Sequence, residues 1–175
     1  MSRSLIIVDM QNDFITGLLG TPEALEAERY ILKELDFNSF STIFITRDTH
    51  FSHYLETAEG KKLPVPHCIH KTEGWQISAP IMEKVYESGV PYLYLDKHSF
   101  GYNQWSSLSA FLNTNEEIVI VGVCTDICVI SNALILKSFF HEIPIKVISY
   151  MCAGTTSEKH DEALDVMRSC QIDII

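Results

Sequence analysis

Short apolar runs recur along the chain, and amphipathic segments lie between them. The clearest run is the Ile-Val-Ile-Val sequence at 118–121, which is β-branched, uncharged and typical of a buried strand. Comparable runs predict further strands within residues 4–8, 37–46 (strongest at 42–45), 91–95, 143–148 and 172–175. Apolar positions three or four residues apart predict helices within 22–35, 75–87, 105–112 and 157–168, and one more after the 118–121 strand.

This alternation of strands and helices predicts βαβ units and a mostly parallel sheet with both faces covered. We expect a three-layer α/β/α fold with six strands and Rossmann-like topology, in a single domain spanning residues 1–175. In such sheets the functional site lies beyond the carboxyl ends of the strands. Several side chains at or just past these ends are therefore expected to meet at one edge: Asp9, Asp48, Lys97 and one of Cys124 and Cys128.

The segment that follows residues 118–121 predicts a sharp turn into a helix. Thr125 is the predicted N-cap, because its hydroxyl can accept a hydrogen bond from a free backbone amide. Cys128 would then lie in the first helical turn, where free amides and the helix dipole favour a thiolate. Cys124 is the alternative nucleophile, and packing in the core is the ordinary role of such a cysteine.

Asp9, Lys97 and Cys128 make a candidate nucleophilic triad. A cysteine nucleophile needs a base that accepts its proton and a cation that stabilises the thiolate. A carboxylate and an ammonium at strand ends that face the same edge meet both needs. Taken singly, Asp9 also fits a turn residue, and Lys97 also fits a solvated ion pair with Asp96.

Residues 47–73 form a long segment rich in His, Pro and Gly without clear periodicity, which is typical of a functional loop. Asp48 and His50 are two positions apart, so in an extended chain they project to one side. Further candidate ligands follow in the same segment: His53, Glu56, Glu59 and His67. Imidazole and carboxylate ligands together suit zinc, iron or manganese. Exposed loop histidines are the alternative interpretation.

Composition narrows the possible partners. The formal net charge is −10 and the longest run of basic residues is Lys61-Lys62, which argues against nucleic acid and anionic membranes as partners. The N-terminal apolar run ends at Asp9, too early for a signal peptide or a membrane span. The five cysteines contain no CxxC pair, as expected of reduced thiols in a cytoplasmic protein.

Four aromatic residues lie near the candidate clusters: Phe14, Trp75, Tyr102 and Trp105. Their rings could stack against a flat substrate, or they could pack in the hydrophobic core.

Five motifs together resemble the isochorismatase-like cysteine hydrolases, and most of all the metal-containing nicotinamidase (pyrazinamidase) branch. The motifs are VDMQNDF at 8–14, TRDTH at 46–50, PHC at 66–68, LDKHSF at 95–100 and GVCTDICV at 122–129. The resemblance runs in order from residue 5 to about residue 170. The combination of an Asp…Lys…Cys order with GVxTDxCV is its most specific part.

The resemblance implies roles for individual residues. Asp9, Lys97 and Cys128 would form the catalytic triad, which selects Cys128 over Cys124. A cis peptide between Val123 and Cys124 is implied, with the amides of Cys124 and Cys128 forming an oxyanion hole. The other implied sites are a divalent metal, zinc first and iron or manganese as alternatives, and a substrate pocket. The implied metal ligands are Asp48, His50, His67 and Glu59, with His53 as the alternative to Glu59. The implied pocket residues are Phe14, Trp75 and Tyr102.

The resemblance also implies a reaction and a partner. We expect a homo-oligomeric amidohydrolase that converts a small amide, nicotinamide first, to the acid and ammonia through a cysteine thioester. A related hydrolase of an N-carbamoyl or ureido compound is the second hypothesis. A non-catalytic metal- or ligand-binding module of the same fold is the third.

Overall fold

One parallel sheet forms the centre of the molecule. In residues 2–112 and 117–175, which this computed structural model describes, the sheet has six strands in the order β3-β2-β1-β4-β5-β6. The strands are β1 (Arg3–Val8), β2 (Thr42–Asp48), β3 (Tyr92–Lys97), β4 (Glu117–Val123), β5 (Ile145–Ala153) and β6 (Asp173–Ile174). The predicted parallel α/β fold is confirmed.

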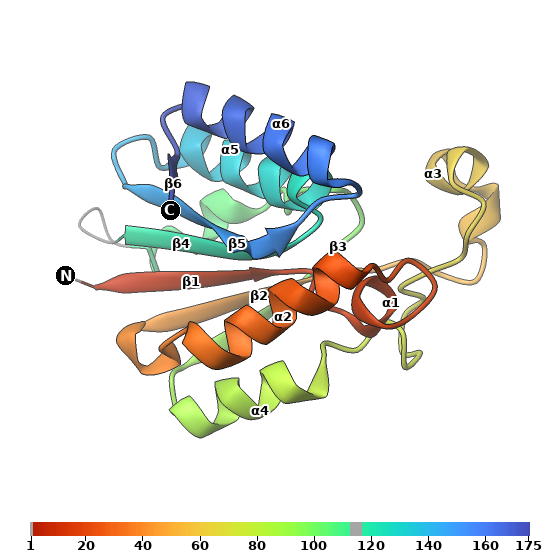
Figure 1. Ribbon diagram of the computed structural model, residues 1–175, viewed down its shortest axis with the longest axis horizontal. Helices are drawn as coiled ribbons and strands as arrows, with labels where there is room; N and C mark the ends of the chain where they lie inside the picture. The colour runs from red at the N-terminus through yellow and green to blue at the C-terminus, as the bar shows by residue number, and fades with distance from the viewer. Residues whose placement is uncertain (1, 113–116) are drawn as a thin grey trace.

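Helices cover both faces of this sheet, as Figure 1 shows. The two faces carry α2 (Pro22–Glu34) with α4 (Ala79–Ser88), and α5 (Ile130–Phe139) with α6 (Ser157–Ser169). Successive side chains of β1 point to opposite faces, so its apolar residues enter both cores. Leu5 and Ile7 pack with α2 and α4, whereas Ile6 and Val8 pack with α5 and α6. A strand buried on both sides explains the continuous apolar run in the sequence.

Several element boundaries differ from those predicted. The 37–46 strand begins only at Thr42, because Asp36 caps a 3-10 turn at Phe37–Ser39 by accepting a hydrogen bond from the Asn38 amide. The 75–87 helix begins at Ala79, because Ile77 forms an extended bridge with Gln11. The 105–112 helix is a 3-10 turn at Trp105–Leu108, and β5 continues to Ala153, well beyond the predicted 148.

The segment between β2 and α4 contains more regular structure than its sequence suggests. A 3-10 turn (Tyr54–Glu56) leads into the short helix α3 (Ala58–Lys62), which stands out from the body of the molecule in Figure 1. The Thr57 hydroxyl accepts a hydrogen bond from the Gly60 amide and so caps this helix. A second short helix, α1 (Asn12–Ile15), follows β1.

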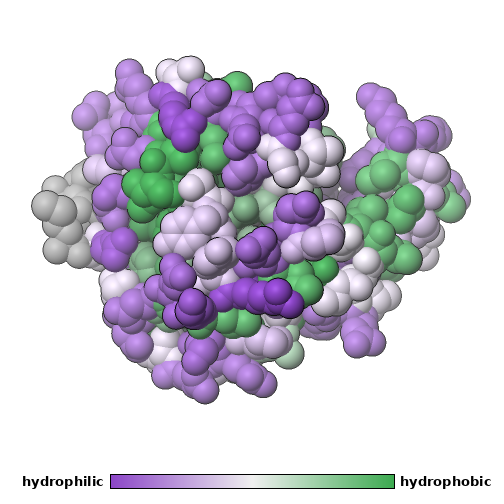
Figure 2. All heavy atoms as spheres, in the orientation of Figure 1, coloured by the Kyte–Doolittle hydropathy of each residue, from purple (hydrophilic) through white to green (hydrophobic). Residues whose placement is uncertain are grey.

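Polar side chains cover much of the face seen in Figure 2, and apolar side chains show on the lobe that carries α3. Leu55 and Leu63 of that lobe are exposed. No helix in the described part of the chain has the length and apolar character needed to cross a membrane.

Gly122 lets β4 lie directly against β1, and its replacement by alanine is expected to destabilise the fold. A Cβ at this position would lie 2.1 Å from the Val8 carbonyl oxygen, and the residue has φ +122°. We expect Gly122→Ala to lower the free energy of unfolding by about 3 kcal/mol, measured by urea denaturation. Gly89→Ala is the control, because φ is +65° there but nothing lies within 4 Å; a cost of about 1 kcal/mol is expected. Equal losses for the two variants would contradict the close approach as the cause.

Candidate active site

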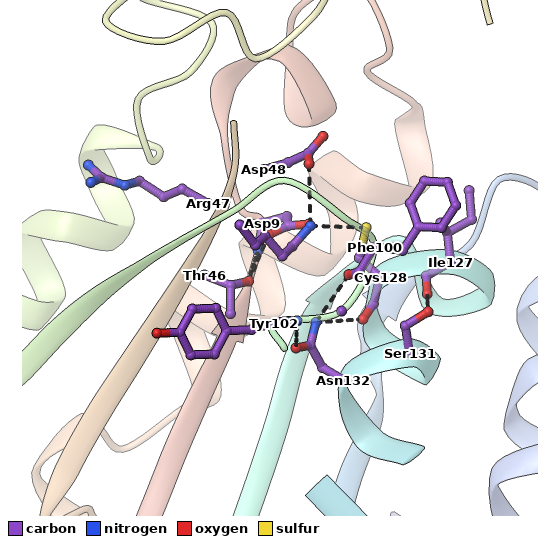
Figure 3. A network of polar contacts seen from close by, with 12 residues as sticks. Asp9, Thr46, Arg47, Asp48, Phe100, Tyr102, Ile127, Cys128, Ser131 and Asn132 are labelled. Atoms are coloured by element: carbon purple, nitrogen blue, oxygen red, sulfur yellow. Dashed lines mark hydrogen bonds and ion pairs between the residues drawn. The ribbon is translucent and has the colours of Figure 1, made fainter. Parts of the chain in front are cut away.

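Three side chains from three strand ends meet at the carboxyl edge of the sheet. Asp9 follows β1, Lys97 ends β3, and Cys128 lies in a π-helical turn (Thr125–Val129) after β4. The Lys97 Nζ lies 2.7 Å from Asp9 Oδ2 and 3.6 Å from Cys128 Sγ. All three side chains are buried, and Figure 3 shows the Asp9 and Cys128 side chains close to each other, with Asp48 beside them. The structure thus brings together the carboxylate, the ammonium and the sulfur.

The backbone turn after β1 directs the Asp9 carboxylate. Asp9 has φ +49°, a left-handed conformation that Asp tolerates better than most residues. The Thr46 hydroxyl of the neighbouring strand donates a hydrogen bond to Asp9 Oδ1 at 2.7 Å, which leaves Oδ2 facing Lys97. Thr46 was missed by the sequence analysis, because a threonine inside a strand carries no signal of its own.

The turn that carries Cys128 differs from the predicted capped helix. The N-cap is Cys124, whose carbonyl accepts hydrogen bonds from the amides of Ile127 and Val129. Thr125 is not the cap, because its hydroxyl pairs with His160 Nδ1 at 2.8 Å. The peptide between Val123 and Cys124 is cis, as the resemblance implied.

Burial governs the proton of Cys128. Burial raises the pKa of the Cys128 thiol well above its usual value, and nearby Asp9 raises it further, while Lys97 opposes both. This direction is opposite to the expectation that the helix terminus would favour a thiolate. Burial therefore favours the protonated thiol over the thiolate, and activation of the thiol calls for a base.

Asp9 is the nearby candidate for this base. Burial raises the pKa of Asp9 above the usual value for a carboxyl group, Lys97 lowers it, and the charge of Asp48 raises it. Lys97 is itself held in the charged form: burial alone would lower its pKa, but Asp9 and Cys128 raise it above its usual value. The ammonium thus stays charged beside a thiol and a carboxyl whose proton affinities are both increased.

A second cluster of polar side chains lies beside the triad. One ligand atom from each of Asp48, His50, Glu59 and His67 lies within 4.8 Å of all the others. Asp48 Oδ2 is 2.9 Å from His50 Nε2 and 3.4 Å from His67 Nε2. Two imidazoles and two carboxylates are a donor set that suits a divalent transition metal ion. The residues present therefore fit a metal ion.

Local structure brings each of these side chains to the cluster. Asp48 is the last residue of β2, and Glu59 lies in α3. His67 Nδ1 pairs with the Val65 carbonyl at 2.8 Å, which leaves Nε2 to face the cluster. His53, the other candidate for the fourth ligand, is exposed and stacks on the Phe51 ring. The geometry favours Glu59 over His53.

Asp48 belongs to both clusters. Its Oδ1 lies 3.4 Å from Lys97 Nζ, while its Oδ2 faces the two histidines. Burial alone would raise the pKa of Asp48, but hydrogen bonds with His50 and His67 and the charge of Lys97 hold it well below its usual value. One ionised carboxylate therefore joins the candidate metal site to the amine of the triad.

The candidate pocket aromatics lie in different surroundings. The Phe14 ring lies 5.5 Å from His67, beside the metal cluster. Tyr102 is half-buried and packs edge-on against Trp105, which is fully buried core. Trp75 is buried. Its Nε1 donates a hydrogen bond to the Thr49 hydroxyl, and the Arg47 guanidinium group covers its ring. Of these three rings, that of Tyr102 is half-buried, whereas those of Phe14 and Trp75 are buried.

A comparison with known protein families identifies the family of this chain. A family model described as the isochorismatase domain matches residues 3–175. The chain belongs to the isochorismatase family. The resemblance inferred from the five motifs is thereby confirmed.

Curated relatives of this isochorismatase-family chain include nicotinamidases. The nicotinamidase of Schizosaccharomyces pombe is 27% identical over 207 residues, covering 98% of this chain and 92% of the relative. The nicotinamidase/pyrazinamidase of Mycobacterium tuberculosis is 24% identical over 192 residues, covering 99% and 98%.

Solved structures share the fold. The nicotinamidase from Bacillus subtilis superposes with a TM-score of 0.81 at 23% identity, covering 99% of each chain. The pyrazinamidase of Pyrococcus horikoshii in complex with zinc superposes with a TM-score of 0.72 at 22% identity, covering 100% of this chain and 99% of the other.

Proposed function

We propose that this chain hydrolyses the carboxamide of a small molecule, most directly nicotinamide, to the carboxylic acid and ammonia. The observation that carries the proposal is the buried Lys97 amine, 2.7 Å from a carboxylate and 3.6 Å from a thiol. These are the base, the cation and the nucleophile that cysteine-dependent amide cleavage needs. Membership of the isochorismatase family and the names of the curated relatives support the choice of an amide.

In the first half of the reaction, the Cys128 thiol transfers its proton to Asp9, and Lys97 stabilises the thiolate. The sulfur attacks the carboxamide carbon, and the amides of Cys124 and Cys128 stabilise the resulting oxyanion. When the C–N bond breaks, the leaving nitrogen takes the proton from Asp9 and departs as ammonia. A thioester to Cys128 and an ionised Asp9 remain.

In the second half, Asp9 accepts a proton from a water molecule as the water attacks the thioester carbon. The C–S bond breaks, the acid is released, and the proton held by Asp9 returns to the Cys128 sulfur. The triad is then ready for another turnover. Each proton transfer uses the same carboxylate, and burial raises its pKa above the usual value for a carboxyl group.

We propose a divalent metal ion, zinc first, held by the cluster of Asp48, His50, Glu59 and His67. When bound, the ion would anchor the ring nitrogen of the substrate or a water molecule. The Pyrococcus horikoshii pyrazinamidase, described in complex with zinc, supports zinc over iron or manganese. We propose that Phe14, Trp75 and Tyr102 would bound the flat substrate. In this proposal, residues 47–73 are the metal-binding segment of a single cysteine hydrolase domain. We also propose that the protein is a homo-oligomer.

A substrate panel tests the proposed reaction. Purified protein is incubated with nicotinamide, pyrazinamide and N-carbamoylsarcosine, and ammonia release is measured. Nicotinamide is expected to be cleaved fastest. Preference for the N-carbamoyl compound would overturn the substrate assignment in favour of a ureido hydrolase. Cleavage of none of the three by metal-loaded protein would overturn the enzymatic proposal in favour of a binding module.

Removal of one carboxylate tests the metal proposal. Glu59→Gln keeps the shape of the side chain but removes its charge, so we expect Zn²⁺ affinity to fall by about tenfold or more. Zn²⁺ binding is measured by competition with a chromophoric chelator. Glu56→Gln, an exposed carboxylate outside the four-residue cluster, is the matched control and should bind zinc as the original chain does. Equal affinity of the two variants would contradict the assignment of Glu59.

The Thr46 hydrogen bond predicts a shift in pH dependence. Because this bond favours the ionised form of Asp9, Thr46→Val should raise the Asp9 pKa. Activity requires the ionised base, so the acidic limb of kcat/KM should move to higher pH. A shift of about one unit is expected, since a hydrogen bond to a charged group contributes about 1.5 kcal/mol. Thr42→Val, at the other end of β2, is the control. An unmoved limb would argue against Asp9 as the base.

A further inference from the structure

Gln11 is a fully buried glutamine outside both the triad and the metal cluster. Its side-chain amide makes three hydrogen bonds, all to backbone groups. Oε1 accepts from the Asp48 amide at 2.7 Å, and Nε2 donates to the Asp48 carbonyl at 2.9 Å. Nε2 also donates to the Trp75 carbonyl at 2.9 Å.

The two bonds to Asp48 have the pattern of a neighbouring strand. The pairing between β1 and β2 ends with Val8 opposite Thr46, because the chain leaves the sheet at Asp9. β2 continues to Asp48 and remains paired with β3, where Asp48 lies opposite Lys97. On the β1 side, the Gln11 amide supplies the donor and the acceptor that a continued strand would have provided.

Asp48 is the residue whose orientation matters most at this point. One carboxylate oxygen faces the Lys97 amine, and the other faces His50 and His67. A carboxylate with two different partners requires a fixed backbone, because a small rotation would move both oxygens. The Gln11 side chain fixes this backbone by hydrogen bonds to the Asp48 amide and the Asp48 carbonyl.

We propose that Gln11 is a positioning residue for the metal ligand Asp48. It acts through the Asp48 backbone, keeping one carboxylate oxygen on the metal cluster and the other on the amine of the triad. The same amide holds the loop carrying Trp75 against the end of β2, so three segments are joined at one side chain. The inference rests on the proposed function only in taking the four-residue cluster as a metal site.

An amide is required at this position, since the side chain must accept one hydrogen bond and donate two. A glutamate has nearly the same shape, but when ionised it has no donor. It would place negative charge against the carbonyls of Asp48 and Trp75. A methionine keeps the length of the side chain and removes both the donors and the acceptor.

The test measures metal binding directly on the full chain. Metal-free protein is titrated with Co²⁺ while its visible absorption is recorded, and Zn²⁺ affinity is measured by competition with a chelator. Gln11→Glu and Gln11→Met are compared with Gln76→Glu, an exposed glutamine of the Trp75 loop that serves as the matched control. Circular dichroism and thermal unfolding of the metal-free proteins report whether each variant folds.

Both Gln11 variants are expected to bind Zn²⁺ about tenfold more weakly or worse, with an altered Co²⁺ spectrum. The Gln76→Glu control should match the original chain. Folded Gln11 variants with unchanged affinity and spectrum would overturn the inference. If Gln11→Glu fails to fold, the result for Gln11→Met decides the test. If neither variant folds, Gln11 is assigned a role in sheet stability, and the inference is overturned.

This design separates the inference from the proposed function. If the original chain binds neither Co²⁺ nor Zn²⁺, the metal site and the role of Gln11 are both overturned. If it binds them and Gln11 has no effect, only the positioning role is overturned. If the metal results hold but no amide is cleaved, only the proposed reaction is overturned.

Discussion

Replacing Cys128 with alanine is expected to abolish the hydrolysis of nicotinamide. The substitution removes the sulfur that forms the thioester, and no other cysteine side chain is paired with Lys97 in the described structure. Loss of a covalent nucleophile lowers kcat by roughly 10³-fold or more in comparable systems. Steady-state ammonia release provides the measurement.

The control for this variant is Cys170→Ala, which removes an exposed thiol at the C-terminal end of α6. It should retain full activity, and both variants should unfold at similar temperatures. Cys128→Ala activity above a tenth of the original would contradict the nucleophile assignment. A similar loss in Cys170→Ala would point to a general effect of thiol removal.

Replacing Lys97 with methionine is expected to have the largest effect on stability. Lys97 is 3% exposed and forms ion pairs with two buried carboxylates, those of Asp9 and Asp48. Removing one partner of a buried ion pair leaves uncompensated charge, at a cost of about 3–5 kcal/mol. The loss should appear in urea denaturation of the metal-free protein near pH 7, and ammonia release should fall sharply because the thiolate is no longer stabilised.

The loss in Lys97→Met should shrink as the pH falls, because a protonated carboxyl needs no counter-charge. Lys146→Met provides the control, since Lys146 pairs with Glu117 at a partly exposed position. That pair should contribute about 1 kcal/mol or less. Equal destabilisation by the two substitutions would contradict the buried charge as the cause.

The fold and the meeting point of the triad could be predicted because both follow from periodicity. Apolar runs separated by amphipathic segments indicate parallel strands, and parallel strands end at one edge. Asp9, Lys97 and one of Cys124 and Cys128 were therefore expected near one another, and the family resemblance selected Cys128. The four candidate metal ligands lie together for a similar reason, since Asp48 ends β2 and the following segment returns to it.

The remaining features depend on tertiary contacts that no local pattern carries. Thr125 has the residue type of an N-cap, but its hydroxyl pairs with His160, which is distant in sequence. The helix terminus suggested a lowered pKa for Cys128, yet burial and Asp9 raise it. Gln11 reads as an ordinary polar residue until the turn at Asp9 carries it beside Asp48.

Trapping the thioester tests the central claim most directly. Protein is mixed with nicotinamide, quenched in acid within the first turnover and analysed by intact and peptide mass spectrometry. We predict a nicotinoyl group attached to the peptide that contains Cys128, absent from Cys128→Ala and from samples quenched after the substrate is exhausted. Ammonia release with no acyl group on Cys128, or with the group on another residue, would contradict the account.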